Sequence, residues 1–329
     1  MHCANADDLD SALQARIDEL NGTCTTNSRM CIWTDFVTGN SAADNQWFGV
    51  TYGNGLFVAV SGAPGSNNRV MTSTDGITWT IRTTPVDNTW VDVTYGNGLF
   101  VAVSQTGSLN RIMTSTDGTT WTIRTTPVDS GWIGITYGNG LFVAVANSGA
   151  GDRIMTSSDG SNWTSHAEPV NNSWNDVTYG NGLFVAVAGT GSNNRVMTST
   201  DGNTWTSRTS AADNNWNGVT YGNGLFVAVA TSGTGDGVMT SADGITWTSR
   251  TSAADNSWFD VTYGNGLFVA VASSGTGDRV MTSTDGITWT SRTSPAEISW
   301  FGVTYGNGLF VAVAYDGTGN GAMVAKWQQ

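Results

Sequence analysis

The chain has 329 residues, including 42 glycines and 15 tryptophans, and only 12% of its residues are charged. Its formal net charge is −13, with 13 Lys and Arg against 26 Asp and Glu, which argues against partners that present phosphate groups, such as nucleic acids or anionic membranes. No apolar run approaches the ~20 residues that a membrane-spanning helix needs. The composition is typical of a secreted or surface-displayed all-β protein.

Residues 1–30 are expected to form an extension that is separate from the rest of the chain. The start, MHCANADDLD, has neither the basic nor the apolar segment of a signal peptide, which is compatible with a leader that has already been removed. The following segment predicts a short helix, because apolar residues recur on one side of it: Leu9, Leu13, Ile17 and Leu20. This helix either docks on the rest of the chain or forms the coiled-coil seam of a homo-oligomer.

All three cysteines, Cys3, Cys24 and Cys31, lie at this end of the chain. In a secreted protein such a group indicates a disulfide, and we predict one between Cys24 and Cys31. A metal site is the weaker interpretation, since the two-residue spacing of Cys or His ligands is missing.

From residue 47 onward the chain is a repeat. The word YGNGLFVAV occurs seven times, with its tyrosine at positions 52, 95, 137, 179, 221, 263 and 305, so the period is 43 residues once and 42 thereafter. A regular period of this length is typical of solenoids and propellers.

One repeat predicts four antiparallel strands. WFGVTYG from Trp47 is followed by Asn54-Gly55, a type I′ hairpin signal, and then by the apolar strand LFVAV. A Gly/Ser/Asn loop leads to RVMTST, and Asp75-Gly76 predicts a second two-residue turn into ITWTIRT. Four-stranded units of this length form propeller blades, because each blade buries its apolar faces only against its neighbours.

The last repeat lacks a fourth strand, since it stops at GAMVAKWQQ. The missing strand is expected at the other end, because CIWTDFVTGNSAADNQW (31–47) resembles ITWTSRTSAADNSW (245–258). We therefore predict an all-β fold, a seven-bladed β-propeller over residues 31–329 whose four-stranded antiparallel blades are closed by an N-terminal strand. Blade seven would be shared between residues 31–46 and 300–329.

A motif SxDGxxW recurs in the third-to-fourth-strand turns, as Ser73/Asp75/Trp79, Ser115/Asp117/Trp121, Ser157/Asp159/Trp163, Ser199/Asp201/Trp205, Ser241/Asp243/Trp247 and Ser283/Asp285/Trp289. It resembles the Asp-box of the sialidase-like (BNR-repeat) propellers over about residues 32–327, although that family usually has one more residue between Asp and Gly. The resemblance implies a structural role for the motif, on the face away from the active site of that family.

The two faces of the predicted ring differ in their variability. The GNG and DG turns are the same in every copy, whereas the loops on the other face, between strands two and three and between blades, vary from copy to copy. Variable loops on a rigid scaffold are a common place for binding, although unconstrained drift of surface loops would give the same pattern.

A ring of tryptophans at the start of the inner strands is the first candidate ligand site: Trp47, Trp90, Trp132, Trp174, Trp216, Trp258 and Trp300. Exposed, these side chains would stack against sugars. Buried, they would be wedges between blades, and their presence in every repeat favours the wedge.

Two residues beyond each tryptophan, glycine alternates with aspartate. Asp92, Asp176 and Asp260 would ring the channel and could hold a structural cation, the one cofactor the sequence suggests. The alternation could equally record a two-blade duplication.

Arginines form the third candidate site. With a two-residue turn, four pairs would lie opposite each other on the outer strands: Arg69/Arg82, Arg111/Arg124, Arg195/Arg208 and Arg279/Arg292. Such pairs could grip an anionic sugar. The alternative is that nearby acids neutralise them: Asp87, Asp129, Asp213 and Asp255.

Catalysis finds little support in the sequence. The family resemblance implies inner-strand arginines and a Tyr–Glu pair, which this chain lacks, and the two histidines, His2 and His166, belong to no repeated arrangement. We therefore expect a binding module and not an enzyme. The preferred hypothesis is lectin-like glycan recognition or adhesion, with several equivalent sites on the variable-loop face that give avidity. The alternative is a protein-interaction scaffold, as in the BNR-type photosystem assembly factors that the repeat also resembles, with a surface protein as partner.

Overall fold

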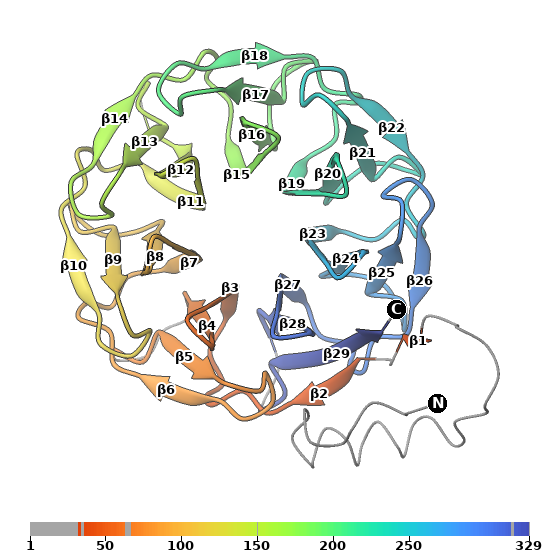
Figure 1. The fold of residues 1–329 in the computed structure, drawn as a ribbon. Coiled ribbons are helices and arrows are strands. Elements are labelled where there is room, and N and C mark those ends of the chain that lie inside the picture. The colour runs from red at the N-terminus through yellow and green to blue at the C-terminus, as the bar shows by residue number, and fades with distance from the viewer. Residues whose placement is uncertain (1–31, 34–35, 63–66, 150, 317–318, 329) are drawn as a thin grey trace.

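The computed structural model describes residues 32–33, 36–62, 67–149, 151–316 and 319–328. In these ranges the chain is all-β, with seven antiparallel sheets arranged as blades around a central axis (Figure 1). The predicted seven-bladed β-propeller is therefore confirmed. The predicted helix in the extension and the Cys24–Cys31 disulfide lie outside the described residues. The described part of the chain contains no helix long and apolar enough to cross a membrane.

Blades one to six each contain four strands, which run in chain order from the axis to the rim (Figure 1). Blade one comprises β3 (Trp47–Gly53), β4 (Leu56–Ser61), β5 (Val70–Ser73) and β6 (Thr80–Arg82). Blade two comprises β7 (Trp90–Gly96), β8 (Leu99–Ser104), β9 (Ile112–Ser115) and β10 (Thr122–Arg124). Blade three comprises β11 (Gly131–Gly138), β12 (Leu141–Ser148), β13 (Ile154–Ser157) and β14 (Thr164–His166). Blade four comprises β15 (Trp174–Gly180), β16 (Leu183–Ala188), β17 (Val196–Ser199) and β18 (Thr206–Arg208). Blade five comprises β19 (Trp216–Gly222), β20 (Leu225–Ala230), β21 (Val238–Ser241) and β22 (Thr248–Arg250). Blade six comprises β23 (Trp258–Gly264), β24 (Leu267–Ala272), β25 (Val280–Ser283) and β26 (Thr290–Arg292).

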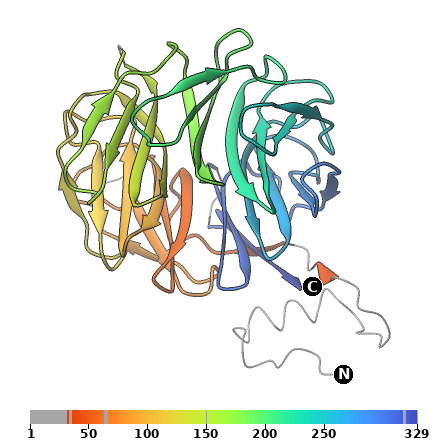
Figure 2. The same ribbon diagram turned by 45° about the horizontal axis from the view of Figure 1, so that its top comes forward.

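Blade seven combines the two ends of the described chain. It contains β27 (Trp300–Gly306), β28 (Leu309–Ala314) and β29 (Ala322–Gln328), and its outer position is filled by β1 (Ile32–Trp33) and β2 (Val37–Gly39), which both pair with β29. Figures 1 and 2 place the C-terminal end beside β1. Closure by an N-terminal strand is therefore confirmed. It leaves no open sheet edge at the junction of the two ends.

The hairpins between the first two strands of each blade have the predicted type I′ geometry. Asn54 and Gly55 have φ angles of 49° and 77°, and the other six Asn-Gly pairs repeat these values closely. Both central residues of a type I′ turn need positive φ, which Asn and Gly tolerate best. The turn residues therefore fix the register of the innermost hairpin in every blade.

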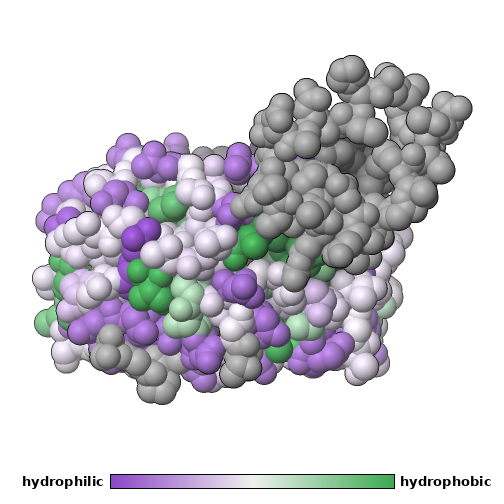
Figure 3. Space-filling view, turned by 90° about the horizontal axis from the view of Figure 1, so that it is seen from below, coloured by the Kyte–Doolittle hydropathy of each residue, from purple (hydrophilic) through white to green (hydrophobic). Residues whose placement is uncertain are grey.

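The hydrophobic core lies between blades. Phe57, Val58, Ala59 and Val60 of β4 are all fully buried, because β4 is covered on both faces. At the interface of blades one and two, Val58 and Val60 pack with Trp90 and other residues of blade two. Polar residues dominate the side of the ring seen in Figure 3, where apolar residues form only small patches. Each blade is thus stabilised mainly by its neighbours.

The turn between the third and fourth strands is longer than predicted. In blade one, pairing ends at Thr72 and Thr80, so the turn runs from Ser73 to Trp79. The Asp75 carboxylate accepts hydrogen bonds from the backbone N–H groups of residues 77 and 78, both at 2.8 Å, and Trp79 Nε1 donates to the carbonyl oxygen of Gly76 at 3.0 Å. These side-chain bonds hold an open loop where the sequence predicted a two-residue turn. The same bonds recur in the other five copies.

Candidate functional site

Each inner strand carries a β-bulge near the variable-loop face. In β3 the register shifts between Trp47 and Gly49, which pair with Ser61 and Val60, so that Phe48 is an extra residue without a partner. A bulge re-aims side chains, and here it brings two successive residues to the axis. The extra residues of the seven strands are Phe48, Val91, Ile133, Asn175, Asn217, Phe259 and Phe301.

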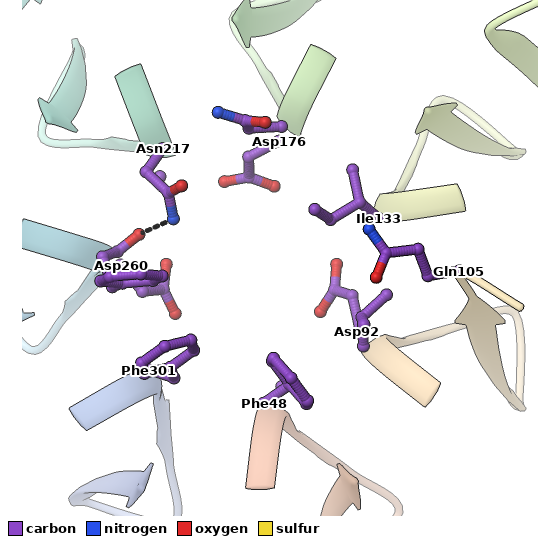
Figure 4. A pocket seen from close by; sticks show the side chains of 13 residues that line it. Phe48, Asp92, Gln105, Ile133, Asp176, Asn217, Asp260 and Phe301 are labelled. Carbon is purple, nitrogen blue, oxygen red and sulfur yellow. Dashed lines mark hydrogen bonds between the residues drawn. The ribbon is translucent and has the colours of Figure 1, made fainter. Parts of the chain in front are cut away.

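These residues surround a cavity of about 230 Å³ on the axis, which we call the axial cavity (Figure 4). All seven inner strands contribute to its lining, together with Gln105 from the loop after β8: Phe48, Gly49, Val91, Asp92, Gln105, Ile133, Asn175, Asp176, Asn217, Gly218, Phe259, Asp260 and Phe301. Since the inner strands begin at the variable-loop face, the cavity lies at that end of the axis.

One sector of the cavity mouth is aromatic. Phe301 stacks on Phe259 with ring centroids 3.9 Å apart and on Tyr315, from the loop after β28, at 4.9 Å. Phe48 meets Phe301 edge to face at 5.6 Å and Tyr315 at 5.3 Å. All four rings are half-buried. This aromatic sector spans blades six, seven and one, across the junction where the ring closes.

Another sector presents amides. Asn217 Nδ2 donates to the carbonyl oxygen of Phe259 at 2.8 Å (Figure 4), and Asn175 Nδ2 donates to that of Trp216 at 2.8 Å. Each amide is anchored on the next blade, which orients its side chain at the cavity wall. The mouth is therefore asymmetric even though the repeats are nearly identical.

Three carboxylates point into the cavity, those of Asp92, Asp176 and Asp260 (Figure 4). One oxygen of Asp92 accepts from the N–H of Val93 at 2.8 Å, and the other accepts from Ile135 of the next blade at 2.8 Å. Asp176 and Asp260 repeat this pattern at 2.7 and 2.8 Å. Each carboxylate therefore links two blades: two to three, four to five, and six to seven.

The alternating glycines make room for these aspartates. A Cβ atom at Gly134 would lie 2.8 Å from the Cα of Asp176, and one at Gly218 would lie 2.8 Å from the Cα of Asp260. In a seven-membered ring the alternation must break once, and it does so where Gly302 of blade seven meets Gly49 of blade one. Packing thus explains the alternation that the sequence left open.

Burial governs the charge of the three carboxyls. It raises the pKa of Asp92 and of Asp260 to about 7, against the opposing effect of the backbone hydrogen bonds. Burial also raises the pKa of Asp176 well above its usual value, and the charges of Asp260 and Asp92 add to this effect. Near neutral pH the cavity therefore carries a partial negative charge.

The predicted cation site does not have the geometry of a metal site. Nowhere in the described ranges do three His, Cys, Asp or Glu side chains form a group that could hold a metal ion. Asp92, Asp176 and Asp260 do surround one cavity, and one oxygen of each accepts a backbone N–H group of the next blade.

The predicted tryptophan ring lies inside the protein. All seven side chains are 0% exposed: Trp47, Trp90, Trp132, Trp174, Trp216, Trp258 and Trp300. They are wedges between blades, as their repetition indicated, and no ring face is open to a sugar. The next residue along each strand lines the axial cavity instead, and it is aromatic in three strands, as Phe48, Phe259 and Phe301.

The predicted arginine pairs are not opposite each other. Because the turn is longer than two residues, Arg82 pairs with Val70, not with Arg69, and its Nε donates to Thr72 Oγ1 at 2.9 Å. Arg124, Arg208 and Arg292 make the same bond. The arginines that immediately precede the third strands instead contact acids. Three of these ion pairs use acids that the alternative interpretation named: Arg69–Asp87 (2.5 Å), Arg111–Asp129 (3.5 Å) and Arg195–Asp213 (3.6 Å). Arg279 pairs with Glu297 (3.2 Å), which was not among them, and Asp255 accepts the backbone N–H of Gly235 at 2.6 Å.

A second cavity, of about 480 Å³, lies on the rim between blades two and three. Arg124 lines it together with Asn162 and the half-buried Trp163. This combination differs from the other blades, because Thr stands at the position of Asn162 in the other five turns. Ligand contact by the outer-strand arginines stays a prediction.

Sequence reasoning missed the residues at the cavity mouth. Phe48, Asn217 and Phe301 follow the repeated tryptophans, and this position varies between copies of an otherwise uniform strand. That variation was a usable signal. Their orientation was not predictable, because strict alternation along a strand would turn this position away from the axis.

Comparisons with known proteins support the fold and nothing narrower. No family model matches the chain, and no curated protein matches it. Among solved structures, virginiamycin B lyase from Staphylococcus aureus is similar, with a TM-score of 0.75 and 15% identity over 90% of this chain and 100% of that one. YCF48 from Cyanidioschyzon merolae has a TM-score of 0.66 and 14% identity over 89% and 98%. YCF48 bound to a D1 peptide has a TM-score of 0.68 and 15% identity over 91% and 98%.

Two expectations change in the light of these matches. The expectation that the chain is not an enzyme is contradicted, because structures of a lyase are among those similar to it. The resemblance to sialidase-like BNR propellers is not confirmed, and what stands is the seven-bladed β-propeller that the chain shares with the lyase and with YCF48. At these identities the likeness concerns the fold alone.

Proposed function

We propose that the chain is a lectin-like recognition protein that binds one glycan ligand at the axial cavity. The observation that carries the proposal is the composition of that cavity, with aromatic rings in one sector and amides and carboxylates in the others. A sugar ring has apolar C–H faces that pack on aromatic rings, and its hydroxyl groups bond to amide and carboxylate oxygens. A concave site with a few oriented polar groups is also the usual form of a small-ligand site.

The expected stoichiometry is one ligand per chain. A mouth with Phe48 and Phe301 on one side and Asn217 on another offers one place for a ligand, not seven equivalent ones. Avidity would then have to come from several chains together and not from several sites on one ring. A secreted or surface-displayed setting, and assembly through the N-terminal extension, stay predictions.

Binding of a protein partner is the second candidate function. It is supported by the similar structure of YCF48 bound to a D1 peptide. An asymmetric mouth such as this one suits an extended peptide as well as a sugar, since an apolar side chain could pack on Phe301. Such a partner would be expected to contact the loops around the mouth as well as the cavity.

A glycan array followed by titration calorimetry tests the proposal, with Phe301→Leu as the diagnostic variant. Leucine keeps an apolar side chain but removes the ring, so affinity should fall by about five- to tenfold while the stoichiometry stays at one. The control is Ile245→Ser, which changes an exposed residue of a turn on the opposite face. Several sites per chain, or equal affinity of the Phe301 variant and the parent, would contradict this location.

A further inference from the structure

We propose that the axial cavity selects a ligand with a protonated amine, so that within the glycan function proposed above its ligand is an amino sugar with a free ammonium group. The inference rests on that proposed function and makes it more specific. Three features of the cavity carry it: the carboxylates, the absence of a lining cation, and the aromatic sector.

The charge of the lining has one sign. Asp92, Asp176 and Asp260 point into the cavity, and the other lining residues are glycine, apolar, aromatic or amide residues, so none of the Lys, Arg or His residues that the structure describes lines it. Every hydrogen bond that these carboxylates are seen to accept comes from a neutral backbone N–H group. A positively charged ligand therefore complements this lining. Electrostatic attraction between the ligand and the carboxylates is stronger in a half-buried cavity than in open water.

The cavity suits an organic cation better than a bare metal ion. The carboxylates do not form a group that could hold a metal, yet they flank the same space. An ammonium group on a sugar ring can approach one or two carboxylates while the ring fills the remaining volume. The acceptor oxygens are already held in place by the backbone, so binding requires little rearrangement.

The aromatic sector provides the other half of the site. Phe48 and Phe301 come from the bulge, one residue before the layer that carries the aspartates, so they lie nearer the mouth. The apolar face of a sugar can pack on these rings while its ammonium group reaches the carboxylates below. Aromatic faces also attract cations, so both layers favour the same ligand.

The experiment compares two oligosaccharides that differ only at nitrogen. Titration calorimetry is run near neutral pH with a glucosamine tetramer and with its fully N-acetylated counterpart. Acetylation removes the positive charge and enlarges the group, so the free amine should bind about tenfold or more tightly, at one site per chain.

Substitution of the carboxylates locates the effect. Asp176→Asn keeps the size of the side chain and should reduce the preference for the free amine, while Asp129→Asn, the same substitution at an exposed ion pair outside the cavity, should leave it unchanged. The comparison of the two ligands on the unchanged protein needs no variant, so the proposal stays testable even if Asp176→Asn does not fold.

Proton release gives an independent readout. Because burial holds the pKa of Asp92 and of Asp260 near 7, part of these carboxyls is protonated at neutral pH, and a bound ammonium group favours their ionised form. Among the described residues, Asp176, Asp92 and Asp260 are the titratable groups that line the cavity. Titrations are run below neutral pH, where the amine is already protonated before it binds, in buffers with different ionisation enthalpies. They should show protons released on binding of the amine and none on binding of the N-acetylated ligand.

The possible outcomes distinguish a failure of the amine selection from a failure of the proposed glycan recognition. Equal or tighter binding of the N-acetylated tetramer would overturn the amine selection and leave glycan recognition standing. Binding of a lysine-containing peptide at one site per chain, with neither tetramer bound, would overturn both. Tight binding of the free amine that Asp176→Asn does not affect would overturn the role of these carboxylates.

Discussion

At the scale of single residues, the aspartates of this chain fall into two groups with opposite acid–base behaviour. Backbone N–H groups in the turns lower the pKa of aspartates such as Asp201 and bring that of Asp243 to about 2. Burial raises the pKa of Asp92 and of Asp260 to about 7. One residue type thus serves as a permanently charged turn acceptor on one face and as a titratable wall of a cavity near the other.

The dependence of stability on pH follows from these shifts. A carboxyl whose pKa is raised on folding stabilises the folded state below its unfolded pKa, and this contribution is lost as the pH rises through the folded pKa. The melting temperature should therefore fall from about pH 5 to about pH 7 and level off above, because over this range the unfolded chain has lost the protons of Asp92 and Asp260 while the folded state still holds them, and the turn aspartates stay ionised. Thermal unfolding followed by circular dichroism measures it.

The matched variant for this prediction is Asp260→Asn, in which the fall should be smaller. His166 has a lowered pKa because it is partly buried, and it titrates in part of the same range with the opposite sign. It is present in both proteins, so its effect cancels in the difference between them. A pH profile that is the same for the parent and the variant would rule out the Asp260 carboxyl as a cause.

At the scale of elements, the aspartate of each third-to-fourth-strand turn stabilises the folded state more through the backbone hydrogen bonds that it accepts than through its charge. The Asp159 carboxylate accepts the N–H groups of Ser161 and Asn162, both at 2.8 Å. Asp159→Ala leaves these donors to water and should lower the free energy of unfolding by about 1 kcal/mol. Asp159→Asn retains an acceptor oxygen and should lower it less. Urea unfolding of the three proteins tests the order, and equal losses for Ala and Asn would show that charge matters more than the acceptor.

The elements also show where sequence reasoning was sufficient. Asn54-Gly55 specifies its turn by backbone conformation alone, so the first hairpin was predicted correctly. Asp75-Gly76 predicts a turn of the same kind, but Ser73 and Asp75 accept hydrogen bonds from backbone N–H groups and hold a longer loop. The pairing of Arg82 is therefore one residue away from the predicted register. Propensity cannot reveal such side-chain bonds, because they depend on the finished loop.

The cavity mouth escaped prediction for a related reason. The sequence placed Asp92 at the axis correctly, since residues two apart share a face of a strand. It could not place Phe48 beside that layer, because a bulge cannot be recognised from the alternation that it interrupts. The fold thus follows from the repeated residues of the chain, whereas the candidate site is made of the residues that differ between repeats.

At the scale of the whole molecule, the ring depends on the contact between segments that are far apart in the chain. Val37 in β2 pairs with Val324 in β29, and the Asp44 carboxylate accepts the N–H of Gly319 at 2.7 Å. Without β1 and β2 the outer edge of β29 would lose its ladder partner, and its free N–H and C=O groups could pair with another chain.

Truncation tests this dependence. Removal of residues 1–46 deletes β1 and β2, and we expect a lower melting temperature together with self-association, detected by light scattering during size-exclusion chromatography. The control removes only residues 1–31 and keeps both strands, so the difference between the two truncated chains isolates the closure. If both stay monomeric and melt together, the pairing with β29 contributes nothing measurable, and the six complete blades hold the seventh through the inner strands alone.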